Sequence, residues 1–213
     1  MRKVFVRSLW TLLAIVILGS AVAFTAIWNG FIGYMPPVED LQNPINRFAT
    51  QIYSADGKVI GTWNFNRENR VCVSYNDISP YLVQALVATE DVRFYDHSGV
   101  DFIALGRAIV KRGLFGQASA GGGSTITQQL AKNMFRMRTN YSTGLLGMIP
   151  GVRMLIVKSK EWIIATKLEM THDKNEILTM YANTVDFGSN AFGIKTAAKT
   201  YFNCSPKDLT VEQ

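Results

Sequence analysis

The sequence contains few of the residues that build metal centres and covalent cross-links. Its 213 residues include two histidines and two cysteines, and neither His97 nor His172 has a Cys or His companion at the spacing of a metal-ligand set. Cys72 and Cys204 are able to pair only outside the reducing cytoplasm. Because one lies in a strand-like run and the other near the chain end, two separate thiols are favoured over a disulfide. A metal-stabilised fold or a disulfide scaffold is therefore not expected.

Acidic residues are fewer than basic ones. The chain has 16 Asp and Glu against 22 Lys and Arg, a net charge of +6 and a pI near 9.4. This balance indicates an anionic partner, which nucleic acid, acidic lipid headgroups or a phosphorylated substrate would satisfy equally well. Disorder is not expected, because 48% of the residues are hydrophobic, enough to fill the core of one ordinary domain with accessory segments.

Charge is absent from residues 9–27, which follow Arg2, Lys3 and Arg7. A bilayer is spanned by roughly 20 apolar residues, so the run predicts a membrane anchor. The alternative is a cleaved signal peptide, because residues 21–23 (Ala-Val-Ala) resemble a cleavage site, but the run exceeds the ~7 to 15 apolar residues typical of such peptides. Basic residues before the span place the N-terminus in the cytoplasm and the rest of the chain outside it.

Composition divides the chain into five parts. We expect a cytoplasmic tail at 1–8, a transmembrane signal anchor at 9–28, a linker at 29–47, a β-rich segment at 48–76 and a helical domain at 77–213. In the β-rich segment, Asp56-Gly57 between the apolar runs 51–53 and 59–60 predicts a hairpin, and a further strand is expected at 70–73.

Capping patterns predict the helices that follow. One expected helix begins at Ser79-Pro80 and ends at Glu90, and a second runs from Asp101 to Val110. A third begins at the Thr125/Gln128 capping box, a fourth runs from about 155 to 170, and a fifth runs from the Asp173/Glu176 pair to Tyr181. A last capping box, at residues 210–213, has no helix behind it. We therefore expect the sequence to be a C-terminally truncated fragment of a longer protein.

Residues 136–160 mix apolar side chains, glycines and flanking cations. Such a segment suits a surface that dips into lipid headgroups. A core-packing loop with solvated basic flanks is the alternative interpretation.

Two groups of residues are candidates for a functional site. Residues 90–99 place Glu90 and Asp91 at a helix end beside aromatic and imidazole groups, where desolvation would raise the pKa of a carboxyl toward that of a general base; two ordinary surface acids are the alternative. Residues 121–133 join a glycine-rich loop to a helix rich in hydroxyls and amides, which indicates an anion or sugar site. No Lys follows the glycines, so this is not a Walker A loop.

Together these residues resemble a known family. The pattern EDxxFxxHxG from Glu90, followed by GSTITQQLxKN from Gly123, is similar to the first two motifs of family 51 peptidoglycan glycosyltransferases, which occur as monofunctional enzymes and as N-terminal domains of class A penicillin-binding proteins. KSKE from Lys158, ILxxYxN from Ile177 and AAxxYF from Ala197 resemble the third to fifth motifs. The resemblance covers roughly residues 78–206.

The third motif departs from the family pattern. Val157 stands where the family has an arginine, so one cation expected near the substrate diphosphate is absent. Arg153, Lys160 or the Arg136/Arg138 pair are the candidates to replace it. Asn203 also stands where a glycine usually follows the fifth motif, and the stretch between the second and third motifs is long.

The resemblance implies a mainly α, lysozyme-like domain that polymerises lipid II into glycan strands and releases undecaprenyl diphosphate. It implies Glu90 as catalytic base and Glu161 as second catalytic carboxylate, which orients the donor or holds Mg²⁺ or Mn²⁺. No cofactor is expected to bind tightly. The candidates for electrostatic stabilisation of the leaving diphosphate are Lys132, Lys158 and the helix start at Ser124/Thr125. The substrate-binding set is Asp91, Phe94, His97, Ser124, Thr125, Gln128, Gln129, Lys132, Asn133 and Lys158.

Other roles follow from the same resemblance. Tyr181 and Asn183 are interpreted as scaffold. The implied partners are lipid II, the growing glycan chain, membrane lipid and other cell-wall synthesis proteins, with no role for nucleic acid. A lytic transglycosylase of similar fold and a non-catalytic membrane-tethered module that binds cell-wall precursors are the alternatives.

Overall fold

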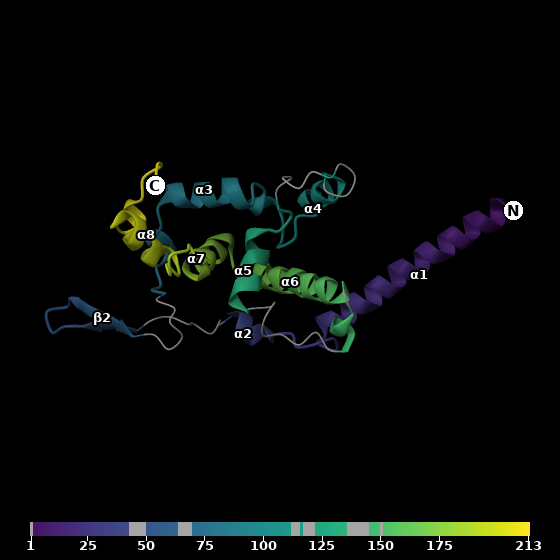
Figure 1. The fold of residues 1–213 in the computed structure, drawn as a ribbon, viewed down its shortest axis with the longest axis horizontal. Helices are drawn as coiled ribbons and strands as arrows, with labels where there is room; N and C mark the ends of the chain where they lie inside the picture. Colours follow the sequence, from purple (N-terminus) through teal and green to yellow (C-terminus); the bar gives the residue numbers. More distant parts are fainter. Residues whose placement is uncertain are drawn as a thin grey trace.

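The computed structural model describes residues 2–42, 50–63, 70–111, 116, 122–135, 145–149 and 151–213. Within these ranges the fold is mainly helical, with a small two-stranded sheet, as the sequence predicts (Figure 1). The glycine-rich loop, from residue 113 to 123, is described only at residues 116, 122 and 123, and the Arg136/Arg138 pair lies outside the described residues.

Helix α1 (Arg2–Trp28) extends away from one end of the domain as a long rod (Figure 1). Its segment Lys3–Trp28 is long and apolar enough to cross a membrane. Only its C-terminal end packs on the domain: Ile27 is buried, and the Nζ atom of Lys167 lies 5.1 Å from the centroid of the Trp28 ring. The anchor helix is thus attached to α6 (Val152–Thr171) by side-chain contacts.

The chain after α1 also packs on α6. Lys160 of α6 is buried, and its Nζ donates a hydrogen bond to the Tyr34 carbonyl at 3.0 Å. Burial lowers the pKa of Lys160, because a desolvated ammonium is disfavoured. The short helix α2 (Val38–Gln42) follows and inserts Leu41 into the core.

The predicted hairpin is confirmed. Strands β1 (Thr50–Tyr53) and β2 (Val59–Trp63) pair antiparallel, with Thr50 opposite Trp63, and the turn between them uses Gly57 at φ +78°, a value that glycine adopts without steric cost. The strand expected at 70–73 is wrong. There the Val73 N–H donates to Asn183 Oδ1 at 3.0 Å and its carbonyl accepts from Asn183 Nδ2 at 2.9 Å, so a side-chain amide replaces a neighbouring strand.

The remaining helices agree with the capping patterns in most cases. They are α3 (Pro80–Glu90), α4 (Phe102–Ile109), α5 (Ile126–Met134), α7 (Lys174–Thr184) and α8 (Ile194–Phe202), with short 3-10 turns η1 (Tyr75–Asp77), η2 (Phe94–Asp96), η4 (Leu145–Met148) and η5 (Pro206–Asp208). Asp101, Thr125 and Asp173 accept the expected capping bonds. Ser79 does not, because its hydroxyl donates to the Leu209 carbonyl instead.

The core forms where α5 packs between α6 and α7. Its buried side chains are Leu41, Phe94, Ile126, Leu130, Ala131, Val157, Ile164, Leu168, Ile177, Leu178 and Tyr181. A second cluster surrounds α8, a helix that the sequence analysis did not predict, and contains Ile78, Ala182, Ala191, Ile194, Ala197, Ala198 and Leu209. Cys72 and Cys204 are both free, so the prediction of two separate thiols is confirmed.

Candidate active site

The adjacent acids Glu90 and Asp91 have opposite surroundings. Helix α3 ends at Glu90, and the chain turns at Asp91, whose φ of −158° and ψ of 75° leave the helical region. The turn carries Asp91 inward, where it is 7% exposed, whereas Glu90 remains exposed at the helix end. The desolvation expected for Glu90 is therefore wrong, and Asp91 is the buried acid of the pair.

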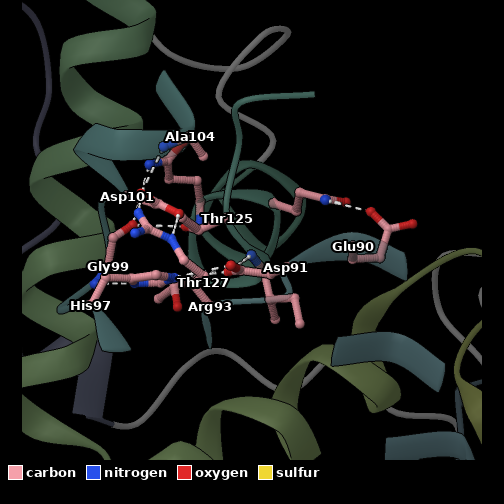
Figure 2. Close-up of polar contacts among 12 residues, drawn as sticks. Glu90, Asp91, Arg93, His97, Gly99, Asp101, Ala104, Thr125 and Thr127 are labelled. Atoms are coloured by element: carbon pink, nitrogen blue, oxygen red, sulfur yellow. Dashed lines mark hydrogen bonds and ion pairs between the residues drawn. The ribbon is translucent and has the colours of Figure 1, made fainter. Parts of the chain in front are cut away.

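Asp91 accepts hydrogen bonds from two elements. The Ile126 N–H donates to its Oδ2 at 3.0 Å, and His97 Nε2 lies 2.9 Å from the same atom. The Gly99 N–H donates to His97 Nδ1 at 3.2 Å, so Nδ1 is the unprotonated nitrogen and Nε2–H faces Asp91. Figure 2 shows this chain of contacts running from His97 to Asp91. His97 thus holds the buried carboxylate, which favours a structural role for this imidazole.

Thr125 and Gln128 bind the same loop from α5. The Thr125 hydroxyl donates to the Gly99 carbonyl at 2.7 Å, and Gln128 Nε2 donates to that carbonyl at 3.2 Å. Thr125 also caps α5 by accepting the Gln128 N–H at 3.1 Å. Because the Gln128 amide turns to Gly99, the predicted capping box forms only in its N-cap half. We call Asp91, His97, Gly99, Thr125 and Gln128 the interior cluster.

Gly99 has no room for a side chain. Its φ is +91°, and an added Cβ would lie 2.7 Å from the backbone carbonyl carbon of Ala165 in α6. Phe94, on the same loop, is fully buried in the core, and Lys174 Nζ lies 4.3 Å from its ring centroid. The loop is thus fixed against α6 and α7, and Phe94 supports the site from inside.

The Glu90 side chain contacts a second glutamine of α5. Gln129 Nε2 donates to Glu90 Oε2 at 2.7 Å, and the Tyr181 hydroxyl donates to Gln129 Oε1 at 3.2 Å. In Figure 2 the carboxylate of Glu90 points away from the labelled interior residues, with the hydrogen bond to it drawn as a dashed line. Burial raises the pKa of Tyr181 to about 12, and the charge of Glu90 adds to the shift. Tyr181 therefore stays a hydroxyl donor at neutral pH.

The third motif and the start of α5 form a cationic site. Lys158 Nζ lies 2.5 Å from Glu161 Oε2 and 3.2 Å from Ser124 Oγ. Glu161 is 1% exposed, and its Oε1 has no hydrogen-bond partner among the described residues. The first N–H groups of α5 are already bonded to Asp91 and Thr125, so the partly exposed Lys158 ammonium is the group that favours an anion next to Ser124.

Helix α5 connects this cationic site to Glu90. Ser124 lies just before the N-cap Thr125, and Gln129 is the fourth residue of the helix. We call Glu90, Ser124, Gln129, Lys158 and Glu161 the open cluster.

The remaining predicted residues lie at the edges. Lys132 and Asn133 are half-buried at the far end of α5 and make no hydrogen bond or ion pair with the open cluster within the described part of the chain. Val157 faces the core. Lys160, one candidate to replace the missing arginine, is wrong for that role because its ammonium is bound to the Tyr34 carbonyl. Arg153 is exposed one turn before Val157 and stays a candidate.

A resident divalent cation does not fit the described residues. Mg²⁺ requires about six oxygen ligands in octahedral geometry, whereas Glu161 offers one unbonded oxygen and already carries the Lys158 ammonium on the other. The described residues contain no group of three Asp, Glu, His or Cys side chains able to hold an ion. The binding of Mg²⁺ or Mn²⁺ by Glu161 stays a prediction that these residues do not support.

Tyr181 is the one site residue that the sequence analysis interpreted as scaffold. It does pack in the core, but its hydroxyl contacts Gln129. The available signal was a hydroxyl at a helical position otherwise reserved for apolar side chains, because such a group needs a partner when buried.

Comparison with known proteins identifies the family of this chain. The model of the transglycosylase family matches residues 56–213. Penicillin-binding protein 1A of Haemophilus influenzae is 37% identical over 203 residues, 95% of this chain and 20% of that protein. The Escherichia coli protein of the same name is 36% identical over 179 residues, 84% of this chain and 19% of that protein.

A third relative gives a similar result. Penicillin-binding protein 1F of Bacillus subtilis is 42% identical over 146 residues, 68% of this chain and 18% of that protein. The chain thus spans about a fifth of the length of these curated relatives. Because the family match covers more than half of the chain and includes both clusters, the chain belongs to the transglycosylase family, the family 51 glycosyltransferases that its motifs resemble.

Proposed function

We propose that this chain polymerises lipid II into glycan strands at the outer surface of the cytoplasmic membrane, with Glu90 as the general base. The carboxylate removes the proton from the 4-hydroxyl of the acceptor sugar. The resulting oxygen forms a bond to the anomeric carbon of the growing chain with inversion, and the bond from that carbon to the diphosphate breaks. Undecaprenyl diphosphate leaves with the electron pair.

The observation that carries this proposal is the position of Lys158. Its ammonium is held between Glu161 and Ser124 at the amino end of α5 and is partly exposed, so an anion can reach it there. A diphosphate leaving group needs such stabilisation. An enzyme that cleaves finished glycan releases no diphosphate, so this arrangement favours the transferase over the lytic alternative.

The exposure of Glu90 also fits the role. A general base must come within hydrogen-bond reach of the proton that it removes, and one carboxylate oxygen of Glu90 is bonded to Gln129 while the side chain is exposed. Glu161 is buried and paired with Lys158, so we assign it to holding the ammonium and not to proton transfer.

Membrane lipid is the proposed second partner. Apolar side chains are exposed on α4 and around the start of α6: Phe102, Ile103, Ile109, Met148, Ile149, Met154 and Leu155. In Figure 1 both regions lie toward the end of the domain from which α1 leaves. Exposed apolar surface near an anchor suits contact with a bilayer, which supports the lipid-facing interpretation of the described part of residues 136–160. Lipid-linked substrates would enter from that side.

The test is product analysis with the full-length protein in vesicles. Wild-type protein should convert lipid II to polymer, and Glu90→Gln should lower turnover by about 10²- to 10⁴-fold, the range for loss of a general base. Glu39→Gln, an exposed acid on α2, is the matched control and should keep full activity.

Each alternative predicts a different product. A lytic enzyme would release fragments from finished peptidoglycan and leave lipid II unchanged. A binding module would retain lipid II in both variants without turnover. Wild-type activity in Glu90→Gln would contradict the assignment of the base.

A further inference from the structure

Gln129 is bonded at both ends of its amide. The NH₂ group donates to Glu90 Oε2 at 2.7 Å, and the carbonyl oxygen accepts from the Tyr181 hydroxyl at 3.2 Å. The reverse orientation would place the amide oxygen against the negative oxygen of Glu90, two acceptors without a proton between them. The acceptor-only Glu90 carboxylate therefore selects the orientation in which Gln129 donates to it, and the Tyr181 hydroxyl then donates to the amide oxygen and holds it from the core side.

The three residues differ in how firmly the fold holds them. Tyr181 is 4% exposed in the core on α7, Gln129 is partly buried on α5, and Glu90 is exposed at the end of α3. Helices α5 and α7 pack directly on each other. The hydrogen bonds thus connect the rigid core to a long, exposed side chain that would otherwise sample several rotamers.

We propose that Tyr181 is a positioning residue for proton transfer, which acts through the Gln129 amide to fix the Glu90 carboxylate with one oxygen bonded and the other directed to substrate. This inference rests on the proposed role of Glu90 as base. One carboxylate oxygen accepts the Gln129 N–H, which leaves the other for the proton of the acceptor sugar.

The neighbouring glutamine provides an internal comparison. Gln128 is buried and its Nε2 donates to the Gly99 backbone carbonyl, so its contact holds the fold. Among the described residues, the side chain of Gln129 bonds to Glu90 and Tyr181 and to no backbone group. A tyrosine needed only for packing has no reason to place its hydroxyl on the amide that touches the base.

The experiment measures initial rates of lipid II polymerisation against pH for Tyr181→Phe, Gln129→Ala and the double variant of the full-length protein. Tyr181→Phe keeps the ring and should lower kcat about tenfold, the size of one hydrogen bond, with KM unchanged. In the Gln129→Ala background, Tyr181→Phe should lower kcat by less than about twofold, because the Gln129 amide that connects Tyr181 to Glu90 is already absent. The matched control is Tyr201→Phe, which removes a hydroxyl bonded to the Phe187 carbonyl and should keep wild-type kcat.

A further variant tests the electrostatics. Gln129→Glu still accepts from Tyr181 but places a second carboxylate against Glu90. The acid limb of the pH profile of kcat/KM should then shift to higher pH by about one unit, since neighbouring like charges disfavour ionisation. An unchanged limb would overturn the inference.

The outcomes separate this inference from the proposed function. An inactive Glu90→Gln with wild-type kcat in Tyr181→Phe would overturn the positioning role alone. Equal losses from Tyr181→Phe in both backgrounds would also overturn it, because that pattern indicates packing. Retained activity in Glu90→Gln would overturn the base and the positioning role together.

Discussion

The interior cluster and the open cluster are built from neighbouring residues and differ in where their polar atoms point. Glu90 and Asp91 are adjacent, as are Gln128 and Gln129, and in each pair one residue belongs to each cluster. Successive positions on a helix are about 100° apart, so Gln128 faces the Gly99 loop while Gln129 faces Glu90. Sequence adjacency therefore does not imply a shared role at this site.

The difference lies in how completely the polar groups are bonded. In the interior cluster the carboxylate of Asp91 and the Gly99 carbonyl each accept two hydrogen bonds from the protein. In the open cluster Glu90 is exposed and Glu161 Oε1 has no partner among the described residues. Fully bonded groups stabilise the fold, and incompletely bonded ones remain for substrate. Changes in the two clusters should thus affect different measurements.

Gly99→Ala should have the largest effect on stability. Its φ of +91° and the 2.7 Å approach of an added Cβ to the Ala165 carbonyl carbon combine backbone strain with overpacking, together about 3 to 5 kcal/mol. Chemical denaturation of the full-length protein in detergent checks this, and activity should fall only as the folded fraction falls. A variant of wild-type stability would show that α6 yields at this contact.

Asp91→Asn should cost about 2 kcal/mol of unfolding free energy. Oδ2 accepts from both Ile126 N–H and His97 Nε2–H, so the new NH₂ takes the place of Oδ1, 3.1 Å from His97 Nε2. Reversing the imidazole tautomer would place a proton against the Gly99 N–H. One unsatisfied or opposed donor remains in either case. The unfolding midpoint should fall, while kcat of the folded protein stays close to wild type. A large loss of kcat without loss of stability would move Asp91 into the open cluster.

Thr125→Val should cost about 1 kcal/mol, the usual value of a lost N-cap. The Gly99 carbonyl keeps its bond from Gln128, which limits the loss. Thr125→Ser retains the hydroxyl and serves as the control, with stability near wild type. Equal stability of the two variants would mean that the cap contributes nothing here.

Glu161→Gln should change stability least, within about 1 kcal/mol and toward higher stability, because it removes a buried charge with one unbonded oxygen. Lys158 is partly exposed and can remain solvated. Polymerisation should nevertheless fall by about 10²-fold or more, since the ammonium loses the group that holds it beside Ser124. Thermal unfolding and turnover measured on the same sample check both statements, and retained turnover would contradict them.

Much of the fold was predictable because the signals are local. Asp56-Gly57 predicts the hairpin, and the capping residues Asp101, Thr125 and Asp173 mark three helix starts, since each makes its bonds within a few residues. The family motifs likewise predicted Glu90 and Glu161 as the two carboxylates of the candidate site. Helix α8 was missed because its capping position is Gly193, which makes no side-chain bond.

The distribution of residues between the clusters was not predictable, because it depends on contacts distant in sequence. Burial of Asp91 requires the Ile126 N–H 35 residues away, and the Tyr181 hydroxyl meets Gln129 52 residues away. Asn183 reaches Val73 across 110 residues, which replaced a predicted strand. Neither propensity nor spacing reports such contacts.

The most direct test of the two-cluster account is one paired measurement on Glu90→Gln and Asp91→Asn: unfolding free energy and lipid II turnover at the same temperature. The account predicts that Glu90→Gln keeps wild-type stability and loses about 10²- to 10⁴-fold in turnover, whereas Asp91→Asn loses stability and keeps turnover per folded molecule. The reverse pattern, or equal losses in both variants, would contradict it.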